Sequence, residues 1–170
     1  MVVEDGTGLE NADSYVSVEF ADDYFSARGV SKWKDIEGEA KEQCLVRATD
    51  YIDNMFRWYG KKMSASQALR FPRKNLKDYE GNEITGIPNC LKQAVCDAAM
   101  ITVDGSELFH KDNENGDVVS ENITSLSFTY SRTNRETADK TLYDSVNTKL
   151  RGLYVDTGKS RILVGKVERV

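Results

Sequence analysis

The chain has 170 residues and a formal net charge of −5, with 39% hydrophobic and 30% charged residues. This length suits one domain with a single modest core. No apolar run approaches the ~20 residues that cross a bilayer, so we expect no membrane partner. The three cysteines lack metal-ligand spacing, and we expect them to be small buried side chains in a reducing compartment.

Four segments repeat apolar residues at steps of three and four, which predicts a mainly α fold, a bundle of about four helices. Ser17 is placed to cap the first, with Val16 and Ala21 as a hydrophobic staple. Pro88 suits the first turn of the third. The predicted helices are Ser17 to Gly29, about Glu39 to about Tyr59, Pro88 to near Gly105, and about Ala138 to about Tyr154.

Shorter elements are predicted between these helices. One helical turn is expected around Ser66 to Leu69, and Gly81-Asn82 is a turn signal. Leu126, Phe128 and Tyr130 alternate with polar residues, which is strand periodicity. Val118 and Val119 are expected to supply the pairing strand, so the sequence predicts a small β-hairpin or sheet insertion at about 117–131.

The last stretch differs from the helical region before it. Residues 159–170 are rich in β-favouring side chains and carry a net charge of +3. A lone strand at a chain end leaves its backbone groups unpaired. We therefore expect a domain over 1–158 and an extended C-terminal docking tail over 159–170. The expected partner-binding residues of this tail are Arg161, Ile162, Leu163, Val164 and Val167.

The sequence offers little for catalysis. His110 is the single histidine, and neither a second histidine nor a cysteine beside it completes a nucleophilic triad. The glycines of Asp5 to Gly8 lack the length and the lysine of a phosphate-binding loop. We predict that the protein is not an enzyme and has no catalytic residue, no metal site and no cofactor.

One stretch concentrates positive charge. Residues 57–77, here called the basic window, contain seven basic side chains and no acid, so the rest of the chain sums to −12. Segregated charge of this kind creates a local field that attracts a partner of opposite sign. The candidate partner-binding residues are Arg57, Lys61, Lys62, Arg70, Arg73, Lys74 and Lys77.

Three interpretations of the basic window remain open. The plainest is a helix end followed by an exposed loop. In the second, single-stranded nucleic acid follows the charges and stacks bases on Trp58 or Phe71, although Trp58 is better placed as a core anchor. In the third, the charges contact an acidic protein surface, including that of another copy, which suits a head-to-tail ring.

Several strings carry a family resemblance that covers about residues 3 to 154. They are Asn11 to Glu19, Leu45 to Asp53, Gln67 to Arg73 and Ile87-Pro88, of which the stretch around Phe71-Pro72-Arg73 is the most specific. This order resembles small head–tail connector, or adaptor, proteins of tailed bacteriophages. Some relatives of that family carry the label of a DnaT-like single-stranded-DNA-binding protein.

The resemblance implies a structural virion protein at the head–tail junction, the neck, made in the host cytoplasm. Such adaptors form a ring of twelve copies under the portal protein, extend the channel for DNA without sequence-specific contact, and meet a downstream tail or tail-completion protein. Residues 159–170 then dock onto a neighbour such as the portal. The alternative is a single-stranded-DNA-binding accessory protein. None of the matched motifs is catalytic.

Overall fold

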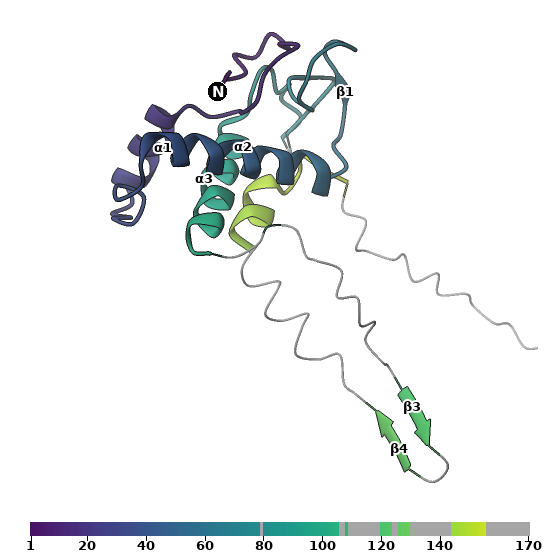
Figure 1. Ribbon diagram of the computed structural model, residues 1–170. Coiled ribbons are helices and arrows are strands. Elements are labelled where there is room, and N and C mark those ends of the chain that lie inside the picture. Colours follow the sequence, from purple (N-terminus) through teal and green to yellow (C-terminus); the bar gives the residue numbers. More distant parts are fainter. Residues whose placement is uncertain (79, 106–107, 109–119, 124–125, 130–143, 156–170) are drawn as a thin grey trace, which may run out of the picture.

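The computed structural model describes residues 1–78, 80–105, 108, 120–123, 126–129 and 144–155. Three helices, α1 (Val18–Ser26), α2 (Gly38–Met55) and α3 (Asn89–Val103), pack together with a helical segment at 144–150 (Figure 1). The predicted mainly α class with small β elements is confirmed. None of the helices in the described part of the chain is long and apolar enough to span a membrane.

Helix α1 begins as its sequence predicts. The Ser17 side chain accepts a hydrogen bond from the backbone N–H of Phe20 at 3.2 Å, which satisfies one free donor of the first turn. Val16 and Ala21, the predicted staple, are both buried. The helix ends at Ser26, three residues before the prediction, and Gly29 takes a left-handed conformation in the turn that follows.

Helix α2 stops earlier than its apolar periodicity predicts. Phe56 is extended, with φ −112° and ψ 140°, and Trp58 forms an antiparallel bridge with Tyr154. The rings of Phe56 and Tyr154 lie 4.7 Å apart, so aromatic packing against a distant segment replaces the last helical turn. Arg57 therefore lies outside α2, and the helix has an acidic start but no basic last turn.

The core lies between α2, α3 and the segment at 144–150. Helix α2, which packs on α3, contributes Leu45 and Ile52 to this core, α3 contributes Ala94 and Ala98, and all four are fully buried. The small alanines let the two helix backbones approach closely. Residues 144–150 are helical and add Val146 and Leu150 to the same core, which confirms this part of the predicted fourth helix.

The predicted hairpin is present as β3 (Ser120–Ile123) and β4 (Leu126–Thr129), which pair antiparallel. The pairing strand begins just after Val118 and Val119, which lie outside the described residues. The tail at 159–170 and His110 also lie outside them.

The helical turn predicted around Ser66 to Leu69 is not formed. This part of the basic window is a loop between two short strands, β1 (Lys61–Lys62) and β2 (Arg73–Lys74), that sequence analysis did not predict. Strand β1 lies near the C-terminal end of α2 (Figure 1). Two-residue strands of basic side chains carry no apolar alternation, so no periodicity indicates them.

Candidate basic interface

The strands β1 and β2 bring four cations into one antiparallel ladder. Lys61 pairs with Lys74, and Lys62 pairs with Arg73. Side chains directly opposite each other in such a ladder are close, and like charges in these positions are destabilising. Because side chains alternate across a strand, Lys61 and Lys74 share one face of the ladder while Lys62 and Arg73 share the other.

A glycine allows the ladder to form. Gly60 has φ +71°, and a Cβ at this position would lie 2.5 Å from the carbonyl oxygen of Lys74. No real side chain tolerates that approach, so glycine is required here by both its backbone conformation and the available space.

Two of the seven cations serve the fold of the loop itself. The Arg73 guanidinium donates to the carbonyl oxygens of Tyr59, of Gly60 at 2.8 Å and of Arg70 at 3.0 Å. Its half-burial lowers the pKa of Arg73 from its usual value. Lys62 Nζ donates to the carbonyl oxygen of Gln67 at 3.1 Å. Both side chains are thus committed to internal carbonyl groups.

Gln67 holds the same loop from the inside. Its side chain is buried, and its Nε2 donates to the carbonyl oxygens of Leu69 at 2.9 Å and Pro72 at 3.2 Å. Its Oε1 accepts from the backbone N–H of Ser64 at 2.9 Å. One amide side chain therefore replaces the regular backbone pairing that this loop lacks.

A carboxylate from α2 lies under the loop. Asp53 accepts a 2.8 Å hydrogen bond from the backbone N–H of Arg70 and a 2.6 Å bond from the hydroxyl of Tyr15. The hydroxyl of Tyr15 in turn accepts from the N–H of Phe71 at 3.0 Å. Burial raises the pKa of Asp53, although the bonds from Tyr15 and Arg70 act in the opposite direction. Sequence analysis missed Asp53 because it belongs to α2 rather than to the basic window.

The remaining five cations are exposed and form no side-chain hydrogen bond or ion pair with the described residues. We call this set the basic interface. Its members are Arg57, Lys61, Arg70, Lys74 and Lys77. An exposed group of one sign on an acidic protein concentrates a positive field that attracts anions.

The aromatic residues of the basic window divide between core and surface. Phe71 is fully buried and Trp58 is 8% exposed, with their rings perpendicular and 5.0 Å apart. Neither ring is available to stack on a base, so the expectation of stacking on Trp58 or Phe71 is wrong, while the core-anchor role of Trp58 is confirmed. Tyr59 is 48% exposed.

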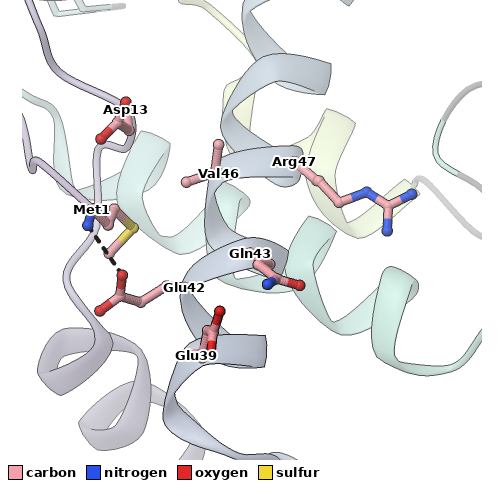
Figure 2. Close-up of a pocket in the computed structure, with 7 residues that line it drawn as sticks. All are labelled: Met1, Asp13, Glu39, Glu42, Gln43, Val46 and Arg47. Atoms are coloured by element: carbon pink, nitrogen blue, oxygen red, sulfur yellow. Dashed lines mark hydrogen bonds and ion pairs between the residues drawn. The ribbon is translucent and has the colours of Figure 1, made fainter.

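A separate surface pocket of about 480 Å³ opens beside the first half of α2 (Figure 2). The Met1 amine pairs with Glu42 at 3.1 Å, and Arg47 extends away from this pair. Three carboxylates and two cations line the pocket, so it has little net charge. Its lining residues are Met1, Asp13, Glu39, Glu42, Gln43, Val46 and Arg47. In the described part of the chain no group of His, Cys, Asp and Glu is arranged to hold a metal ion.

A family model described as "Putative DnaT-like ssDNA binding protein" matches residues 1–170, the whole chain. No curated protein and no solved structure matches the chain.

Proposed function

The chain belongs to the DnaT-like ssDNA-binding family, and from this membership we propose that its basic interface binds single-stranded DNA. The observation that carries the proposal is the pairing of Lys61 with Lys74, two exposed like charges held directly opposite each other. Such a pair costs stability in the free protein. A polyanion that approaches the shared face of the ladder offsets this cost.

The other exposed cations extend the same positive surface. Arg57 lies just before the ladder, Arg70 lies on the loop within it, and Lys77 follows it. Binding through such groups releases counterions from the DNA, and the logarithm of the affinity falls linearly with the logarithm of the salt concentration. Each phosphate neutralised on a single strand contributes about −0.7 to this slope. A local cluster suffices for this effect, even though the net charge of the whole chain is negative.

The test is titration of a labelled oligo(dT) by fluorescence anisotropy at several salt concentrations. Reversing both charges of the ladder pair, Lys61→Glu with Lys74→Glu, should weaken binding and make the salt slope shallower by about 1.4, twice the single-contact value. The matched control reverses Lys34 and Arg47, which are exposed at other places on the protein. Absence of salt-sensitive oligonucleotide binding by the wild-type protein contradicts the proposal.

The single variant Lys61→Glu separates binding from folding. It places a carboxylate opposite Lys74, and an opposite-charge pair in a ladder stabilises by about 0.2–1 kcal/mol. We therefore expect weaker DNA binding without loss of thermal stability. A fall in both quantities shows that Lys61 serves the fold instead.

A second candidate is the phage head–tail adaptor, for which we propose that the basic interface contacts an acidic surface of a neighbouring copy or of the portal. Two observations favour it. Charge is sharply segregated, with −12 outside the basic window, and Trp58 and Phe71 are buried rather than displayed. The proposed assembly is a ring of twelve copies at the virion neck, with residues 159–170 docked on the portal or tail.

The adaptor proposal has its own experiment. Light scattering and negative-stain imaging, with and without a portal protein, should reveal rings, and the Lys61→Glu, Lys74→Glu variant should not form them. Removal of residues 159–170 should weaken portal binding. A monomer that stays monomeric with the portal and does not bind it contradicts the adaptor proposal and leaves DNA binding to be judged by the oligonucleotide titration.

A further inference from the structure

Tyr59 differs from the other aromatic residues of the basic window in its exposure. The exposed large hydrophobic side chains of the described residues are Met1, Val2, Met55 and Tyr59, so Tyr59 is the one aromatic ring among them. An exposed ring loses hydrophobic stabilisation that burial would provide. A ligand that covers the face of the ring restores the lost hydrophobic stabilisation.

The backbone of Tyr59 is fixed on both sides. Its N–H donates to the carbonyl oxygen of Leu153 at 3.0 Å, and its own carbonyl oxygen accepts from the Arg73 guanidinium. The preceding residue, Trp58, is bridged to Tyr154 and buried in the core. The ring is therefore attached to a rigid support and has only two side-chain torsions left to order on binding.

The position of Tyr59 places its ring among the cations. Because Trp58 faces the core in an extended segment, its neighbours Arg57 and Tyr59 face the opposite side, about 6.6 Å apart along the chain. Both are exposed. Lys61 follows two residues later at the start of the ladder. An aromatic ring flanked by exposed cations is the combination by which proteins hold single strands.

We propose that Tyr59 is the base-stacking residue of the basic interface and that it makes this interface select unpaired nucleotides over duplex DNA. This inference rests on the proposed binding of single-stranded DNA. In a duplex the bases are stacked on each other, so their faces cannot lie on the ring of Tyr59, while the phosphates still reach the cations. In a single strand a base can leave its neighbours and lie on the ring of Tyr59.

The test compares Tyr59→Ala with Tyr59→Phe, which keeps the ring and removes only the hydroxyl. For Tyr59→Ala we expect affinity for oligo(dT) to fall by about five-fold or more. Affinity for a duplex of equal length should not change, and neither should the salt slope. Tyr59→Phe should bind oligo(dT) like the wild type.

Each other outcome has a distinct meaning. If wild type binds oligo(dT) and Tyr59→Ala binds it equally well, the stacking role is overturned and the proposed function stands. Equal losses for oligo(dT) and duplex also overturn it, because they show a role in the shape of the surface. If the wild-type protein binds no oligonucleotide, the proposed function fails, and the stacking role fails with it.

Discussion

Lys149 donates hydrogen bonds to the carboxylate of Asp97 and, at 2.9 Å, to the hydroxyl of Tyr24. This links the segment at 144–150 to α3 and α1 at once. Tyr24 also donates to Asp97 at 2.7 Å, so the three side chains form a closed triangle. The Arg28 guanidinium lies over the Tyr24 ring, 3.6 Å from its centre.

Replacing Lys149 with Met should destabilise the protein, because it leaves Asp97 partly buried without its cation. We expect a loss of about 2 kcal/mol in the free energy of unfolding, measured by urea denaturation. Lys34→Met, an exposed lysine outside the triangle, is the control and should change stability little. Equal stabilities of the two variants would show that the triangle contributes nothing.

Alkaline pH should weaken the same triangle. Burial lowers the pKa of Lys149, but its bonds to Asp97 and Tyr24 raise it more, so the net shift is upward from 10.5. For Tyr24, burial itself raises the pKa of the hydroxyl above 10.0. A group with a raised pKa stabilises the folded state below its unfolded pKa and loses that contribution as pH rises through the folded value. Unfolding curves should be measured from pH 9 to 11.5, about one unit either side of these values. The free energy of unfolding should decline over this range, and it should decline less steeply in Lys149→Met than in the wild type.

The carboxylate under the basic loop predicts a pH effect of the same sign in the acidic range, because its pKa is also raised. Because burial raises the pKa of Asp53, ionisation of this group opposes folding at neutral pH. Asp53→Asn removes the charge and keeps an acceptor for the N–H of Arg70, but its amide nitrogen replaces the oxygen that accepts from Tyr15. Its stability relative to that of the wild type should therefore be most favourable at neutral pH, where the wild-type charge opposes folding. This relative stability should decline as pH falls through the raised pKa of Asp53. Chemical denaturation at neutral and acidic pH measures the difference, and a relative stability of Asp53→Asn that rises on acidification contradicts the assignment.

Gly60 should tolerate no side chain. Gly60→Ala forces a Cβ against the carbonyl oxygen of Lys74 and strains a left-handed backbone. We expect a loss of about 2–3 kcal/mol together with a disrupted ladder. Gly29→Ala is the matched control, because Gly29 has a similar φ of +66° and nothing within 4 Å of the added Cβ. Thermal unfolding of both variants separates the cost of the clash from that of the backbone conformation.

Trp58 carries a buried donor that finds no partner in the described part of the chain. Its Nε1 forms no hydrogen bond with the described residues, although the ring packs on Phe56 and Phe71. An unsatisfied buried donor costs about 1–3 kcal/mol. Trp58→Phe removes this donor and keeps an aromatic ring, so it should lose less than about 1 kcal/mol, whereas Trp58→Ala should lose about 3–5 kcal/mol. A large loss in Trp58→Phe would mean that the N–H is bonded in solution.

Local periodicity was sufficient to predict the helices. Leu45, Ala48 and Ile52 recur at helical steps and are all buried, and Ser17 caps α1 as its residue type suggests. The early end of α2 was not predictable in this way. It depends on the ring of Phe56 packing on that of Tyr154 and on the backbone bridge between Trp58 and Tyr154, which are almost one hundred residues apart in the chain.

Composition was sufficient to predict the basic window, but it did not predict which of its side chains serve the fold and which are exposed. Arg73 and Arg70 look equivalent in sequence, yet the Arg73 side chain is bonded to three carbonyl oxygens while that of Arg70 is exposed. Those acceptors come together only through the loop conformation that Gln67 and Asp53 maintain. Residue type alone therefore predicts the charge of the surface and not which charges a partner can reach.

The buried side chain of Gln67 has a practical consequence for handling the protein. Its three hydrogen bonds join neutral groups, and these respond weakly to ionic strength, whereas attraction at exposed charges is screened. High salt should therefore release an anionic partner while the loop keeps its shape. Cycles of high- and low-salt washing should then unload and reload the same immobilised protein without any refolding step.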